Sequence, residues 1–332
     1  MRPAQVFARI SCRFLRDILE IAMAPFPLRI LLEHLIDYAG LFPPAGLAMR
    51  PAVENFETHR HSKPGWMLGR FIVPVSRLQE FEDAFEQLPP VLLPLVRAIR
   101  EDARKWRLSA LIGTDIAADL AAIQEFNRRH ASRQDGREVF IDAIELKAQT
   151  PDDIRKAAQL VPSGLQTFFE IPISTSLQEN IAAIKAVKKC AKVRTGGETA
   201  NLFPSIENLA RFLAACANAK ICFKATAGLH HPIRAAHRFT YEPDSPSGIM
   251  HGFFNVFLAA SFMLYGMDAS AATALLIEES GAAFRFPDHG VTWHNEILSN
   301  AQLLRARQSF CLSFGSCSFE EPVDDLRVLQ LL

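Results

Sequence analysis

Short apolar runs alternate with amphipathic stretches along most of this chain, beginning near residue 67. The run at 68–75 has the length and β-branched residues of a buried strand, and apolar residues in the stretch at 78–87 recur at helical spacing. Repeats of this kind build a parallel sheet covered by helices, which predicts an α/β fold. The predicted strands are residues 36–42, 68–75, 106–113, 139–147, 165–171, 190–195 and 220–226, and the predicted helices are 78–87, 116–130, one opening at 150, 177–189 and 205–217.

The number of strands favours a closed barrel over an open, doubly wound sheet. Seven strand–helix units approach the eight of a (β/α)8 TIM barrel, and no GxGxxG turn marks a nucleotide-binding crevice. The run at 310–315 is the best candidate for the eighth strand, because residues 322–331 follow it as a closing helix. Residues 230–308 would then be a helical and hairpin insertion between strands seven and eight, placed to cap the mouth. We expect residues 23–332 to form this single domain.

Two segments share features with membrane signals. Residues 1–22 carry arginines among apolar residues but lack a long uninterrupted apolar core, so we interpret them as an N-terminal extension rather than a signal peptide. Residues 248–267 are nearly long enough to span a bilayer. Their place late in a chain of soluble pattern favours a helix that is buried on both sides. We therefore expect no membrane partner and a cytoplasmic location.

Composition narrows the partners further. Lysine plus arginine and aspartate plus glutamate balance at 36 each, so the chain has no concentrated basic field and nucleic acid is not an expected partner. The six cysteines are scattered without a CxxC pair, and most lie inside apolar runs. This pattern is typical of reduced, buried thiols, and the absence of clustered ligands argues against a structural zinc site.

Ionisable side chains fall inside several predicted strands, near the carboxyl end of each. Residues two apart on a strand share a face, and the outer face of a barrel packs against helices, so these charges should point into the lumen or the mouth. Cations outnumber acids, which predicts a site for a small phosphate or carboxylate. Crowding and burial would lower the pKa of a lysine and make it nucleophilic, although salt bridges closing the barrel top are the alternative. The cations are Lys147, Lys192, Arg194 and Lys224, the acids are Glu145 and Glu170, and Thr226 shares a face with Lys224.

Short motifs in the second half resemble those of the deoxyribose-phosphate aldolase family. Lys192-Val-Arg-Thr-Gly-Gly is similar to the family's sixth-strand motif and Lys224-Ala-Thr-Ala-Gly to its seventh, while Phe314-Gly-Ser-Cys-Ser resembles its eighth-strand phosphate turn. The resemblance implies a (β/α)8 barrel and reversible aldol chemistry through a lysine Schiff base. It would make Lys192 the Schiff-base lysine and Lys224 the residue that lowers its pKa. It also implies a fifth-strand role for Glu170, a turn at Gly196 and Gly197, and phosphate binding by Gly315, Ser316 and Ser318.

Two histidines follow the seventh predicted strand directly. His230 and His231 fall at the mouth, where a histidine can act as a general acid or base, or ligate a metal together with Glu145 or Glu170. Adjacent loop residues point in different directions, so we do not expect both histidines to bind one metal.

The leading hypothesis is a lyase of aldolase type that acts on a small anionic carbonyl compound and needs no cofactor. Lys192 or Lys224 would form the imine, Glu170 and His230 or His231 would transfer protons, and Arg194 with the turn at 315–318 would hold the anion. One alternative is a metal-assisted isomerase or hydrolase that uses Glu145, Glu170 and a mouth histidine. The other is a non-catalytic barrel that binds an anionic metabolite. Whether the chain forms a homo-oligomer stays open.

Overall fold

Eight parallel strands close into a barrel, which confirms the predicted TIM-barrel fold. The structure is a computed structural model that describes residues 24–89, 105–131, 138–173 and 176–332, so the predicted extension at 1–22 lies outside the described residues. Strand order around the barrel is β1-β13-β7-β6-β5-β4-β3-β2. The barrel strands are β1 (Ile36–Tyr38), β2 (Leu68–Pro74), β3 (Lys105–Leu111), β4 (Glu138–Lys147), β5 (Gln166–Glu170), β6 (Cys190–Arg194), β7 (Phe223–Thr226) and β13 (Cys311–Ser316).

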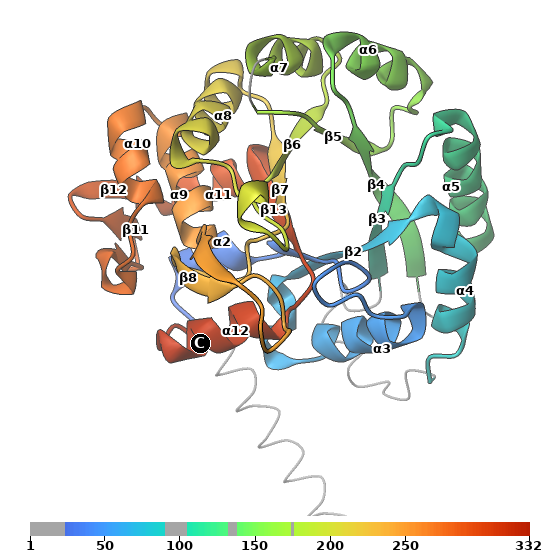
Figure 1. Cartoon of the computed structure of the whole chain (residues 1–332), viewed down its shortest axis with the longest axis horizontal. Coiled ribbons are helices and arrows are strands. Elements are labelled where there is room, and N and C mark those ends of the chain that lie inside the picture. The colour runs from blue at the N-terminus through green and yellow to red at the C-terminus, as the bar shows by residue number, and fades with distance from the viewer. Residues whose placement is uncertain (1–23, 90–104, 132–137, 174–175) are drawn as a thin grey trace, which may run out of the picture.

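Helices surround the ring of strands (Figure 1). Local signals fix several of their starts: Thr150 and Asp153 form a reciprocal capping box, and the Ser205 hydroxyl accepts a hydrogen bond from the Asn208 amide. Among the described residues, the helices outside the 230–308 insertion are α2 (Phe26–Leu32), α3 (Met49–Arg60), α4 (Leu78–Glu86), α5 (Ile116–His130), α6 (Pro151–Leu160), α7 (Leu177–Ala186), α8 (Ile206–Ala219) and α12 (Glu320–Val328), with 3-10 turns η1 (Lys63–Met67), η2 (Val75–Arg77) and η5 (Ala200–Leu202).

The insertion between β7 and β13 divides into two parts. Its first part forms an antiparallel hairpin of β8 (Ala235–Arg238) and β9 (Ser247–Met250), which the sequence pattern did not predict. Its second part includes the predicted hairpin, extended by a third strand, and lies outside the barrel in Figure 1. The second part comprises α9 (Phe253–Leu264), α10 (Ala269–Leu276), η6 (Gly281–Ala283), β10 (Phe284–Arg285), β11 (Gly290–Trp293), β12 (Glu296–Ser299) and α11 (Asn300–Ser309).

Most of the apolar segment at 248–267 forms a buried helix, as its sequence context favoured, but its first residues belong to β9. Helix α9 covers 12 residues, and all but the last are buried. Its apolar residues therefore pack inside the protein on every side. In the part of the chain that the structure describes, no helix is long and apolar enough to cross a membrane.

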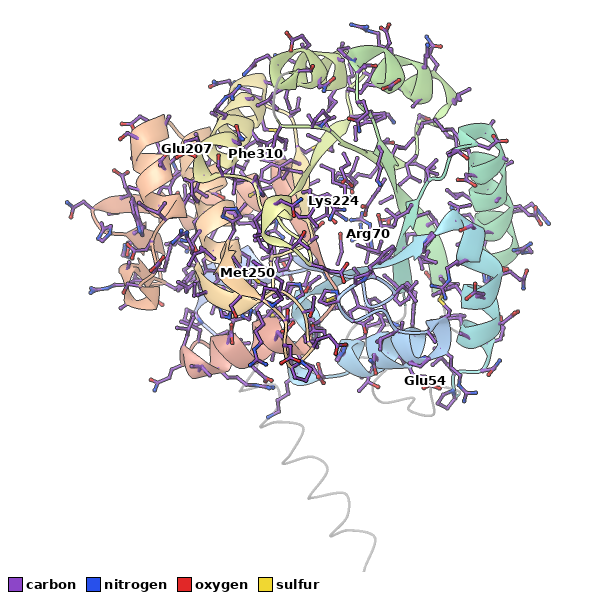
Figure 2. All side chains as sticks on the ribbon, in the orientation of Figure 1. Glu54, Arg70, Glu207, Lys224, Met250 and Phe310 are labelled. Carbon is purple, nitrogen blue, oxygen red and sulfur yellow. A yellow bond between two sulfur atoms is a disulfide. The ribbon has the colours of Figure 1, made fainter. Side chains whose placement is uncertain are left out.

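The barrel interior carries successive layers of side chains. Lys192 on β6 is the register partner of Lys224 on β7, and Figure 2 labels Lys224 inside the ring of strands. Two residues earlier on each chain segment, Cys190 and Cys222 are joined by a disulfide. The interpretation of all cysteines as reduced thiols is therefore wrong for this pair, because strand pairing brings together two residues that are 32 positions apart. Cys216, Cys311 and Cys317 are free and buried, and Cys12 lies outside the described residues.

Candidate functional site

Five buried or half-buried charges form an alternating chain across the barrel. The Lys224 ammonium lies 2.7 Å from Asp37 Oδ2 and 2.7 Å from Glu145 Oε1. Lys192 Nζ in turn lies 2.7 Å from Glu145 Oε2 and 2.8 Å from Glu170 Oε2. Glu145 therefore bridges the two lysines with one oxygen for each. We call Asp37, Lys224, Glu145, Lys192 and Glu170 the charge chain.

Neighbouring donors hold the carboxylates of the charge chain in place. The Ser313 hydroxyl donates to Asp37 Oδ2 at 2.7 Å, and the backbone amide of Arg70 donates to Asp37 Oδ1 at 2.8 Å. The Ser109 hydroxyl donates to Glu145 Oε1 at 2.7 Å. Because Asp37 and Glu145 accept these additional hydrogen bonds, burying their charges costs less than it would for unsupported ions.

The charge chain gives Lys192 a pKa that differs in direction from the one expected from the sequence. Burial lowers the pKa of Lys192, but Glu145 and Glu170 outweigh burial and raise this pKa above its ordinary value. The expectation of a lysine with a lowered pKa is therefore wrong for Lys192, which is an ammonium at neutral pH. The reason for the difference is that one carboxylate, Glu145, contacts both lysines. Asp37 adds a further acid, which was not among the charges counted from the sequence.

The carboxylates are correspondingly stabilised as anions. Burial raises the pKa of Glu145, but the two lysines outweigh it and hold this pKa well below its ordinary value. At Glu170 burial acts in the same upward direction, and Lys192 followed by Arg194 and Lys147 lowers the pKa overall. At neutral pH, then, the carboxylates of Glu145 and Glu170 face the ammonium group of Lys192.

A cavity of about 370 Å³ opens at the carboxyl ends of the strands, directly above the charge chain. Glu145, Glu170 and Lys192 line it, whereas the described lining does not include Lys224, which is fully buried. Of the two lysines that the sequence singled out, Lys192 is therefore the one that a bound molecule can reach. The loop after β1, residues 39–44, also contributes to the cavity wall through Ala39, Phe42, Pro43 and Pro44.

Cations stand around the rim of this cavity. Lys147 and Arg194, the last residues of β4 and β6, both line it and both are exposed. Arg194 Nε lies 3.5 Å from Glu170 Oε1, so one half-exposed guanidinium extends the charge chain to the solvent. Thr226, Gly197 and Gly315 line the same cavity.

The remaining predicted residues of the turns lie behind the wall. A Cβ atom at Gly196 would stand 2.7 Å from Gly228 Cα, so glycine permits the close approach of the loops that follow β6 and β7. The Ser316 hydroxyl accepts a hydrogen bond from the Ser318 amide, and the Ser318 hydroxyl accepts one from the Glu321 amide at the start of α12. Both hydroxyls are thus engaged within the turn, and the described lining of the cavity includes neither serine.

The two adjacent histidines pair with different carboxylates, and of the two His230 alone lines the cavity above the charge chain. His230 lines the cavity above the charge chain, and its Nδ1 lies 2.8 Å from Glu321 Oε2. His231 Nδ1 lies 2.6 Å from Asp325 Oδ2, and its ring stacks on His237 with centroids 3.4 Å apart. The described lining of this cavity does not include His231, which lines a second cavity of about 290 Å³ together with His230.

The first part of the insertion covers the mouth and the second part does not contribute to it. The residues from 230–308 that line the cavity are His230, Phe239 and Met250, all from the segment around the β8–β9 hairpin. Helix α9 packs against α8, α10, α11 and β13 on the outside of the barrel. The cap is therefore shorter than the predicted 230–308.

Within the described residues, no group of three or more histidine, cysteine, aspartate or glutamate side chains is placed to hold a metal ion. Glu145 and Glu170, the carboxylates of the metal hypothesis, are each engaged by Lys192. His230 is engaged by Glu321, which comes from α12.

Sequence reasoning missed three members of the site. Asp37 lies within the first predicted strand, residues 36–42, but was not counted among the charges of the site, although an acid inside the run Ile-Asp-Tyr was the available signal. Cys317 was treated as one of several scattered thiols. Glu321 lay just before the predicted closing helix, residues 322–331, and carried no signal of its own. No protein-family model matches the chain, and a search of curated proteins found no match to it.

Proposed function

We propose that this protein is a lyase of aldolase type that forms an imine between Lys192 and a small anionic carbonyl compound. The observation that carries the proposal is the position of the Lys192 amine, which lines the cavity between the carboxylates of Glu145 and Glu170. An amine in this setting has an adjacent proton acceptor on each side, as imine chemistry requires.

Lys224 has a different role in this proposal. Its side chain is fully buried beneath the cavity, and both of its short contacts are to carboxylates. Lys224 therefore orients Glu145 and keeps it ionised. The aldolase resemblance instead assigns Lys224 to lowering the pKa of its neighbour, a role that the carboxylates beside Lys192 oppose.

Proton transfer precedes the covalent step, because Lys192 is an ammonium at neutral pH. Glu170 is the better acceptor of its proton, since the Glu170 side chain is 15% exposed and that of Glu145 only 1%. The neutral amine then adds to the carbonyl carbon, and Glu170 returns the proton to the resulting hydroxyl group, which leaves as water and gives a protonated imine. This cation withdraws electrons from the adjacent carbon–carbon bond, which cleaves or forms, while Glu145 remains ionised and balances the positive charge.

Arg194 and Lys147 supply the anion specificity. Both lie at the rim with exposed side chains, so a carboxylate or phosphate on the substrate can contact them while its carbonyl reaches Lys192. Guanidinium groups bind planar carboxylates and phosphates through two parallel hydrogen bonds.

Borohydride trapping tests the imine. The protein is incubated with glyoxylate, pyruvate or a small sugar phosphate, reduced, and mapped by peptide mass spectrometry. We expect a stable adduct on Lys192 that is absent in Lys192→Met and retained in Lys105→Met, an exposed lysine that pairs with Glu138 and is not part of the described cavity lining. Absence of any Lys192 adduct with every probe would overturn the proposal.

One observation favours a second function. The raised pKa of Lys192 is equally suited to a barrel that binds an anionic metabolite without turnover. Calorimetric binding of the same probes that weakens in Lys192→Met, accompanied by no trapping in the wild type, would support this second function.

A further inference from the structure

A second nucleophile shares the cavity with Lys192. Cys317 directly follows β13, is 5% exposed, and lines the same cavity wall as Lys192 and Glu170. The other described free thiols, Cys216 and Cys311, are fully buried, and the described linings of the cavities include neither.

Three side chains from separate segments surround the Cys317 sulfur in a definite order. His230 Nε2 lies 3.9 Å from Cys317 Sγ, and the opposite ring nitrogen, Nδ1, lies 2.8 Å from Glu321 Oε2. The Tyr241 hydroxyl donates to the same Glu321 oxygen at 2.8 Å and lies 3.6 Å from the sulfur. A thiol, an imidazole and a carboxylate in this order are the parts from which nucleophilic thiols are built.

We propose that Cys317 is a thiolate nucleophile, paired with His230 and positioned through Glu321, that adds reversibly to an aldehyde carbon held in the cavity. The proposal rests on the proposed function only for the choice of a carbonyl substrate. In this proposal Lys192 holds one carbonyl partner as an imine, and Cys317 holds the aldehyde partner as a hemithioacetal.

The chemistry balances without a further reactant. The thiolate sulfur forms a bond to the carbonyl carbon, and the electron pair of the carbon–oxygen double bond moves to oxygen. The imidazolium Nε2–H of His230 donates its proton to that alkoxide, which leaves a hemithioacetal and a neutral imidazole. Reversal of these steps releases the aldehyde and restores the ion pair.

The electrostatics of His230 agree with this role. Burial lowers its pKa, but contacts with Cys317 and Glu321 outweigh burial and raise the pKa to about 10. The imidazole is therefore a cation at neutral pH, with the carboxylate of Glu321 on one ring nitrogen and the sulfur near the other. Cationic neighbours of this kind stabilise a thiolate.

Alkylation with iodoacetamide, followed by peptide mass mapping, measures the reactivity of each thiol in the full chain. We expect Cys317 to react at least about tenfold faster than Cys216 and Cys311, and His230→Gln to remove that advantage. His231→Gln is the matched control, because His231 pairs with Asp325 and should leave the rate unchanged. Cys317 reacting no faster than the two buried thiols in the wild type would overturn the proposal, and this comparison needs no variant.

Glyoxylate protection tests the adduct separately from the imine. We expect glyoxylate to slow alkylation of Cys317 in the wild type and equally in Lys192→Met, where no imine forms. A Lys192 adduct on borohydride trapping without protection of Cys317 would overturn this inference and leave the proposed function standing. Protection of Cys317 without any Lys192 adduct would support this inference and overturn the proposed function.

Discussion

Replacing Glu145 with glutamine removes the carboxylate that two buried ammonium groups share. Glutamine has nearly the same shape, so one oxygen can still accept from Lys224 and Ser109, but its amide group presents hydrogen atoms to the Lys192 ammonium. The interior then holds Asp37 and Glu170 against Lys192 and Lys224, with each lysine reduced from two carboxylate partners to one. Breaking a buried ion pair from one side costs about 3–5 kcal/mol.

That cost is large for a folded domain. Against a total unfolding free energy of roughly 5–15 kcal/mol, Glu145→Gln should remove a substantial fraction of the stability. At about 2 °C per kcal/mol for a chain of this size, the midpoint of thermal unfolding should fall by about 6–10 °C. Circular dichroism during heating or urea titration, without reductant, measures both quantities.

Glu138→Gln is the matched control for this experiment. Glu138 lies on the same strand and pairs with Lys105 at 3.5 Å, but its side chain is 57% exposed, so the loss should stay below about 1 kcal/mol. Combining Glu145→Gln with Lys192→Met leaves Asp37 with Lys224 and Glu170 with Arg194, so the double variant should be less destabilised than the sum of the two changes. Equal effects of Glu145→Gln and Glu138→Gln, or strict additivity in the double variant, would refute the reasoning.

Three further outcomes follow from the described contacts. The free energy of unfolding should fall below about pH 5, because Glu145, Glu170 and Asp142 have lowered pKa values in the folded protein and stabilise it fully only above the unfolded carboxyl pKa. It should also decline from about pH 6.5 to about pH 10, because His230 has a raised pKa in the folded protein and stabilises it fully only below the unfolded histidine pKa. Melting curves across this range check both limbs, and a decline above pH 6.5 that persists in His230→Gln would contradict the assignment. Reduction of the disulfide, or Cys190→Ser with Cys222→Ser, should cost about 3.5–4 kcal/mol for a separation of 32 residues, and the double variant should show no further response to reductant. Arg194→Gln should weaken calorimetric binding of phosphate or pyruvate by about 10–100-fold, whereas Arg107→Gln, a similarly exposed arginine paired with Asp142, should leave it unchanged.

The barrel was predictable because its signals are local. Each barrel strand is a short apolar run, and features such as the capping box at Thr150 mark where a helix begins. Counting these units and recognising 310–315 as the eighth strand needed no knowledge of contacts. The β8–β9 hairpin was missed because its strands are four residues long and largely exposed, without the alternation that marks a half-buried strand.

The site was only partly predictable, because its chemistry depends on pairings between distant strands. The sequence showed that Lys192 and Lys224 lie near strand ends, but not that one glutamate would lie between them. The same pairing of β6 with β7 that aligns the lysines also aligns Cys190 with Cys222, so the disulfide was inferable once register was fixed. The division between His230 and His231 depends on which carboxylates of α12 each ring meets, and neither contact has a local signal.

The charge chain also has a consequence for how the barrel assembles. Its three acids, Asp37, Glu145 and Glu170, all precede residue 171, whereas its two lysines both follow residue 190. Strands β1–β5 alone would therefore expose the three acids of the charge chain, and strands β6, β7 and β13 alone would expose its two lysines. The two sets of charges compensate each other only when the last strands pack against the first. Closure of the barrel is therefore favoured over association of two identical partial barrels, which would bring like charges together.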